Sequence, residues 1–353
     1  MAHDGFSRRS TYGFALRGGI VAIAALALIG HARQAWAAPC ATATPSCVEW
    51  VTVQPSAGRS LVYSTYPLAT PNPAITRALI LVHGGGRDAQ NYFRTAVAAA
   101  LLSGALENTL VMAPRLASRM GACQDTLADN EINWDCGEGS AGGWRSGAVS
   151  VSHGAVTTYH LVDQLVERAA DRALFPNLTH VVVAGFSAGG QFVSRYQMAN
   201  QAHDKVRVPV TYVVASASSY PYLDARRPAA DGLFVVPANA AACAGYDRWS
   251  YGLGARAGYA APLSDEQLRR QFLSRSTTFI VGELETPESP ALDRACQAMS
   301  QGASRMERVR GFLKFVSEQY GAKHPLVVAP QCGHQARCVL TTDTVLPLLF
   351  PPR

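Results

Sequence analysis

One serine lies where a catalytic nucleophile is expected. Residues 181–190 read Val-Val-Val-Ala-Gly-Phe-Ser-Ala-Gly-Gly, and the apolar run predicts a buried strand that ends near Ala184. Ser187 would then lie on a turn so tight that only small neighbours fit, and Gly185 and residues 188–190 are small. A G-x-S-x-G turn of this kind lifts a serine hydroxyl clear of the sheet edge. The alternative is a glycine-rich turn whose serine has no catalytic role.

A second glycine cluster could stabilise the negative charge that develops when a serine attacks a carbonyl. Residues 78–82 predict a strand, and His83 and three glycines follow it. The tetrahedral intermediate of acyl transfer carries an oxyanion, which backbone N–H groups can bind. Gly85 and Gly86 offer such donors without a side chain in the way, and the amide of Ala188 would add another.

A serine hydroxyl is a weak nucleophile and needs an adjacent base, which is usually a histidine. Residues 326–330 predict a strand, and His334 follows it after three residues. In the chain order Ser…Asp/Glu…His, the base follows the last strand. We therefore predict that His334 is the base.

A third residue, an acid, must hold the imidazole in the correct tautomer. Residues 277–281 predict a strand, and Glu283 and Glu285 lie just beyond its exit. We predict Glu285, because the acid normally lies a few residues beyond the strand. Asp293 and Glu283 remain alternatives.

Strand-like and helix-like segments alternate along the chain and would position these side chains. Further strands are expected at 48–54, 60–66, 109–113 and 210–215, and helices at 91–102, 153–173, 188–200, 303–319 and from about 338. The first two strands would form a hairpin. Alternation of apolar strands with helices predicts an α/β fold with a mostly parallel sheet covered on both faces.

Two long segments interrupt this alternation. Residues 117–152 form a loop rich in Gly, Cys and Trp, and loops of this length are usually functional. Residues 217–275 are rich in Gly, Pro and aromatic residues and predict a cap-like or lid-like insertion within a catalytic domain spanning 38–353. Its aromatic side chains could line a substrate cleft or form a small core of their own.

The N-terminus has the features of an export signal. Arg8, Arg9 and Arg17 precede an apolar stretch at 18–30, and Ala-Trp-Ala at 35–37 offers a cleavage site. A membrane-spanning helix needs about 20 apolar residues, so the stretch is too short for an anchor. We predict a signal peptide at 1–37 and a secreted or periplasmic protein.

All eight cysteines follow this segment, and an even number in an exported chain favours disulfides. Pairing of sequence neighbours would join 40 to 47, 123 to 136 and 332 to 338, and would leave 243 with 296. No His/Cys cluster has the spacing of metal ligands, so we expect no metal site.

The charge balance does not indicate a nucleic-acid partner. The chain has 31 Lys and Arg against 25 Asp and Glu, and residues 1–37 contribute four of the arginines and one aspartate. The remainder is only mildly basic, and no cluster of basic residues appears.

The chain resembles the α/β-hydrolase superfamily, and more narrowly a group of secreted serine hydrolases distantly related to lipases and polyester depolymerases. The resemblance rests on His83-Gly84, Arg87, Tyr92-Phe93, Ala184–Gln191, Arg195-Tyr196, Ser218–Tyr220, Tyr251–Leu253, Gly282–Glu285, Cys296–Gly302 and Gly333-His334. It implies a Ser187–Glu285–His334 triad with oxyanion donors from the Gly84–Arg87 turn and Ala188. Relatives usually carry aspartate where Glu285 stands.

These observations predict a secreted hydrolase that cleaves a small-molecule or polymeric carboxylic ester through an acyl-enzyme. Such a mechanism requires no cofactor. Two alternatives use the same fold: an exported binding module without activity, and an acyltransferase that prefers an alcohol acceptor to water.

Overall fold

The computed structural model describes residues 10, 11, 13, 38–137 and 142–352. Apart from three of its residues, the predicted signal peptide at 1–37 lies outside the described residues. Within the described ranges, no helix is both long enough and apolar enough to cross a bilayer.

An eight-stranded sheet forms the centre of the fold. In chain order its strands are β1 (Val48–Thr52), β2 (Arg59–Ser64), β3 (Arg77–Val82), β4 (Thr109–Pro114), β7 (His180–Phe186), β8 (Val210–Ala215), β11 (Thr277–Gly282) and β12 (Leu326–Ala329). Their spatial order is β1-β2-β4-β3-β7-β8-β11-β12. β1 pairs antiparallel with β2, and β2 with β4, whereas every later pairing is parallel.

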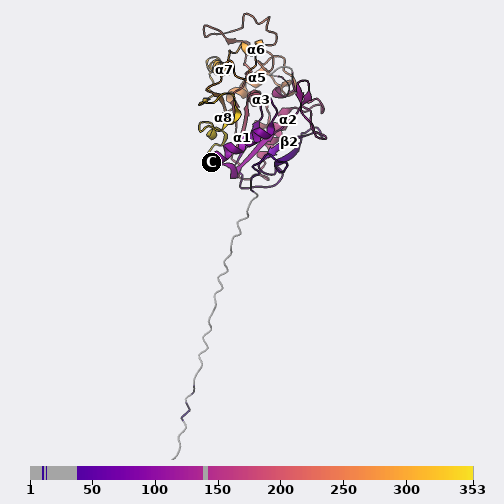
Figure 1. Ribbon diagram of the computed structural model, residues 1–353, viewed down its shortest axis with the longest axis vertical. Coiled ribbons are helices and arrows are strands. Elements are labelled where there is room, and N and C mark those ends of the chain that lie inside the picture. Colours follow the sequence, from indigo (N-terminus) through magenta and orange to yellow (C-terminus); the bar gives the residue numbers. More distant parts are fainter. Residues whose placement is uncertain (1–9, 12, 14–37, 138–141, 353) are drawn as a thin grey trace, which may run out of the picture. The chain divides into compact units, whose positions relative to one another are not determined.

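Helices cover both faces of the sheet, because its inner strands are apolar on both sides. In β3, for example, Ala78, Ile80 and Val82 pack on one face and Leu79 and Leu81 on the other. The first face is covered by α2 (Thr158–Ala169), α3 (Ala188–Ala199), α5 (Asp265–Ser274) and α7 (Arg305–Tyr320) (Figure 1). The second is covered by α1 (Ala89–Leu102), α8 (Ala336–Leu340) and α9 (Leu346–Leu349).

The predicted α/β sheet and the opening hairpin are confirmed, and three elements differ from the prediction for identifiable reasons. β7 continues two residues beyond Ala184, because its ladder with β8 extends to Phe186. α2 begins only at Thr158, since the Thr157 side chain caps the helix by accepting from the His160 N–H. The expected terminal helix is two short helices, and Pro347 in the first turn of α9 fits only a helix start.

The two long segments hold short elements. The segment after β4 contains the two-stranded ribbon β5 (Arg119–Met120) and β6 (Cys123–Gln124), and the 3-10 helix η3 (Gly143–Ser146). The segment after β8 contains the ribbon β9 (Arg227–Pro228) and β10 (Phe234–Val235), the 3-10 helix η4 (Gly258–Ala260), and α5. The remaining short helices are η1 (Pro45–Cys47), η2 (Leu106–Asn108), α4 (Ala202–Lys205) and α6 (Cys296–Met299).

All four expected disulfides are present. Cys40 bonds Cys47, Cys123 bonds Cys136, Cys243 bonds Cys296, and Cys332 bonds Cys338. The last of these closes the loop that carries His334.

Candidate active site

Ser187 lies on the sharp turn between β7 and α3. Its φ is 58° and its ψ −117°, a conformation that non-glycine residues rarely adopt. Its N–H donates to Ala215 O at 2.9 Å, which ties the turn to the neighbouring strand. A Cβ on Gly189 would overlap the carbonyl oxygen of Val82, and one on Gly190 would overlap that of Ala215. The glycines therefore let α3 approach the sheet closely enough to form the turn.

The structure brings the three sequence-predicted side chains together. Ser187 Oγ lies 2.9 Å from His334 Nε2, and His334 Nδ1 lies 2.9 Å from Glu285 Oε2. Because a carboxylate only accepts hydrogen bonds, Nδ1 donates to Glu285 and Nε2 is left to accept from the serine hydroxyl. This is the arrangement in which a histidine can remove a serine proton.

Hydrogen bonds between two loops set the distance between Glu285 and His334. The loop after β11 carries Glu285, and the loop after β12 carries His334. The N–H of Leu284 donates to Cys332 O at 2.9 Å, and Glu283 accepts the N–H of Gln331 at 2.8 Å. Glu283, one of the alternative acids, is therefore engaged in holding the loops.

Asp293, the other alternative acid, has different partners. Its carboxylate accepts from the Tyr251 hydroxyl at 2.7 Å and from the Ala295 N–H at 3.0 Å. Of the three acids considered, Glu285 is the one that hydrogen-bonds to His334.

Glu285 is buried but remains suited to carry a negative charge. Burial by itself raises the pKa of this carboxyl, but the hydrogen bond and charge of His334 and the Arg305 guanidinium outweigh that effect, so the pKa lies below its ordinary value. Arg305 Nη1 lies 3.4 Å from Glu285 Oε2, and both side chains are fully buried. Sequence reasoning missed Arg305, since no motif marks it.

The three predicted oxyanion donors lie beside Ser187. Gly85 and Gly86 line a pocket of about 540 Å³ together with Ser187 and His334. A Cβ added to Gly85 would lie 3.9 Å from the Ala188 Cβ, so these two residues are neighbours. Ala188 is the first residue of α3, and its N–H has no acceptor within the helix.

A comparison with models of protein families identifies the family of this chain. The model of the alpha/beta hydrolase family matches residues 79–344, which is most of the chain and includes Ser187, Glu285 and His334. The chain belongs to the alpha/beta hydrolase family.

Two solved structures share the fold of this alpha/beta hydrolase. The poly(3-hydroxybutyrate) depolymerase LpqC from Bordetella parapertussis is 20% identical, with a TM-score of 0.57 over 87% of this chain and 90% of that one. Poly(aspartic acid) hydrolase-1 from Sphingomonas sp. KT-1 is 18% identical, with a TM-score of 0.55 over 86% and 98%. No curated protein sequence shows significant similarity to the chain.

His83 holds the glycine turn of this hydrolase in place, a role that the sequence did not reveal. Its Nε2 accepts the Leu116 N–H at 3.0 Å, so Nδ1 carries the proton and donates to Gly84 O at 2.9 Å. The ring is fully buried and packs edge-on against Trp144 at 5.0 Å between centroids. Burial lowers the pKa of His83 to about 4, so the ring is neutral at pH 7.

We expect His83 to make the fold sensitive to acid. In the unfolded chain a histidine takes up its proton near pH 6.5, whereas in the folded state it resists protonation down to about pH 4. The unfolded state thus binds more protons between these values, and the free energy of unfolding falls as the pH drops through this window, by about 3 kcal/mol in total. Urea unfolding of the wild type and of His83→Phe at pH 7.5 and 4.5 isolates this contribution. An equal loss of stability in both proteins would contradict it.

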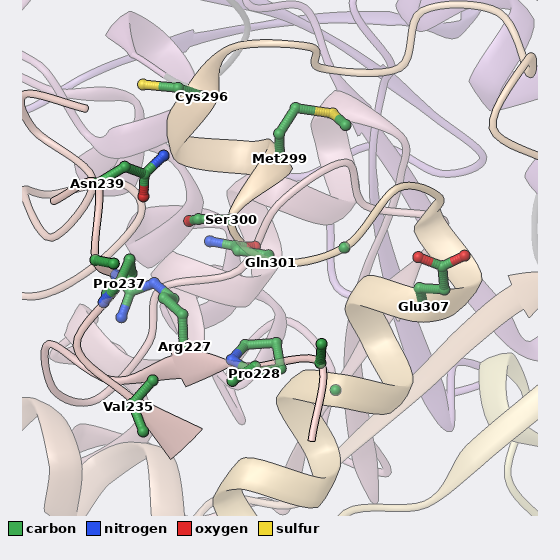
Figure 2. A pocket seen from close by; sticks show the side chains of 15 residues that line it. Arg227, Pro228, Val235, Pro237, Asn239, Cys296, Met299, Ser300, Gln301 and Glu307 are labelled. Carbon is green, nitrogen blue, oxygen red and sulfur yellow. The ribbon is translucent and has the colours of Figure 1, made fainter. Parts of the chain in front are cut away.

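A second pocket, of about 690 Å³, does not contain Ser187, His334 or Glu285. Figure 2 shows its side chains coming from 227–239 and from 296–307. Conversely, no residue of 217–275 lines the pocket beside Ser187. The cap-like role of that segment therefore stays a prediction.

Three aromatic residues of 217–275 form hydrogen bonds with described residues outside this segment. Trp249 donates to Ser146 O at 2.9 Å, and the hydroxyl of buried Tyr259 bonds Asp163. Tyr251 contacts Asp293.

Proposed function

We propose that this protein is an exported serine hydrolase that cleaves carboxylic esters, with Ser187 as nucleophile, His334 as base and Glu285 as the acid that orients it. The observation that carries the proposal is the pair of 2.9 Å hydrogen bonds that join the three side chains in series. Membership of the alpha/beta hydrolase family supports it.

The reaction follows from this geometry. Ser187 Oγ attacks the ester carbonyl while His334 Nε2 takes its proton, and the N–H groups of Gly85, Gly86 and Ala188 bind the resulting oxyanion. The carbon–oxygen bond to the alcohol then breaks, and His334 returns the proton to the leaving alkoxide. Water, deprotonated by His334, cleaves the acyl-enzyme and restores the serine. Glu285 stabilises the imidazolium in both steps.

The proposed location follows from the cysteines. Every cysteine lies in a disulfide, and disulfides persist in oxidising compartments. Four disulfides thus support secretion or a periplasmic location, as does the predicted signal peptide. The substrate would be a small or polymeric ester that reaches the pocket beside Ser187.

Labelling with a fluorophosphonate tests the activated serine directly. We expect the probe to modify Ser187, as mapped by peptide mass spectrometry, because the reagent requires a nucleophile with an adjacent base. His334→Ala should suppress labelling. A binding module without activity would stay unlabelled, which would refute the proposal. An acyltransferase would be labelled but would transfer the acyl group to an alcohol in preference to water.

A further inference from the structure

Arg145 is a buried cation close to the proposed oxyanion donors. It lies in η3, and only 9% of its surface is exposed. Its Nη2 lies 4.0 Å from the position that a Cβ on Gly85 would take, and the Ala188 Cβ lies 3.9 Å from the same point. The guanidinium therefore reaches Gly85, one of the residues whose amides are proposed to bind the oxyanion.

The guanidinium of Arg145 has few protein partners. Nη1 makes one long hydrogen bond to Cys136 O at 3.4 Å, and Nε is buried with no partner among the described residues. No carboxylate in the described part of the chain forms an ion pair with it. The Trp144 ring lies beside the guanidinium, with its centroid 4.9 Å from Cζ. The charge of Asp293 also acts on Arg145, although the two side chains form no ion pair. Burying a charge with so few partners is unfavourable unless another group compensates the charge.

Two neighbouring arginines have guanidinium groups whose partners are well defined. Arg87 forms an ion pair with Asp125 at 2.6 Å. Fully buried Arg195 donates to Ser250 O at 3.1 Å, to Ser219 Oγ at 3.3 Å and to Arg145 O at 3.5 Å. Arg145 differs from both, because its Nη2, the nitrogen that lies close to Gly85, has no hydrogen-bond partner among the described residues.

An N–H group of a charged guanidinium is a strong donor to a carboxylate. Such a charge-assisted hydrogen bond is roughly twice as strong as one between neutral groups. We propose that Arg145 binds a carboxylate of the substrate, so that the enzyme prefers esters carrying a free acid close to the scissile carbonyl. This inference rests on the proposed esterase function and specifies its substrate class.

A pair of matched substrates tests the preference. The 4-nitrophenyl monoesters of succinic, glutaric and adipic acid carry a free carboxylate, and their methyl-capped forms do not. We expect the wild type to favour at least one acid over its capped form, and Arg145→Met to lower that ratio of kcat/KM by about 10- to 100-fold, the usual effect of a lost hydrogen-bonded charge. Arg145→Lys should retain part of the preference, because it keeps the charge but carries it on an ammonium group of different shape.

Two controls separate recognition from structure. Arg270→Met removes the same charge from an exposed position on α5, where the side chain is 65% exposed, and should leave the ratio unchanged. The melting temperature of Arg145→Met should equal or exceed that of the wild type, because the substitution removes a buried cation that forms no ion pair within the described part of the chain.

The outcomes also distinguish this inference from the proposed function. An equal fall in kcat/KM for acid and capped ester, or an unchanged ratio, would overturn the role of Arg145 while leaving the esterase standing. If the wild type hydrolyses neither ester, the esterase proposal fails. The proposed carboxylate site at Arg145 is then tested by measuring adipate binding with calorimetry. Binding that is lost in Arg145→Met supports the carboxylate site, and equal binding overturns it.

Discussion

Replacing Ser187 by alanine is expected to lower kcat/KM for an activated ester by about ten-thousand-fold or more, with the fold preserved. The Ser187 hydroxyl is the only group that would form the covalent acyl intermediate, so its loss leaves only the oxyanion donors and substrate binding. Steady-state hydrolysis of 4-nitrophenyl acetate, with circular dichroism to confirm the fold, measures the effect.

The same chain offers a matched control. Ser194 lies on the same helix, is fully buried, and its hydroxyl has no partner among the described residues, so Ser194→Ala should leave the rate unchanged. Because Ser187 and His334 would act as a unit, the double variant Ser187→Ala/His334→Ala should be no slower than the slower single variant. Substantial turnover by Ser187→Ala would remove this serine as the nucleophile.

Replacing Gly189 by alanine is expected to destabilise the protein by about 3 kcal/mol or more. The new methyl group would overlap the backbone carbonyl of Val82 at the end of β3, and a carbonyl in a central strand cannot move aside as a flexible side chain can. The helix would have to shift away from the sheet, and Ser187 would shift with it. Urea unfolding reports the stability, and ester hydrolysis reports the site.

Gly154→Ala provides the comparison for this substitution. An added methyl group at Gly154 meets no atom within 4 Å, so stability should stay close to that of the wild type. If Gly189→Ala were as stable as Gly154→Ala, the close approach of α3 to the sheet would not be what requires glycine at this position.

Local patterns of residue type predicted most of the fold. The apolar runs at 78–82 and 210–215 indicate strands buried on both faces, and each forms a strand of the parallel part of the sheet. The small residues around Ser187 predicted the tight turn, because their spacing along the chain already reflects a short-range steric limit. Boundaries were less accurate where a cap or a proline decided them, as at Thr157 and Pro347.

Contacts between segments that are far apart in the sequence could not be predicted from local patterns of residue type. The sequence left three acids open, and hydrogen bonds between the loops after β11 and β12 decide which one reaches His334. Arg305 and His83 also contact residues far from them in the sequence, Glu285 and Leu116.

The sequence by itself determined the α/β fold, the serine turn and the residue types that we propose for acyl transfer, since these depend on neighbours within a few positions. Only the tertiary structure decided that Glu285 hydrogen-bonds to His334 and that Arg145 lies beside Gly85 without an ion pair among the described residues. The physical reason is that hydrogen bonds, burial and electrostatic pairing depend on distance in space, which residue spacing along the chain does not specify.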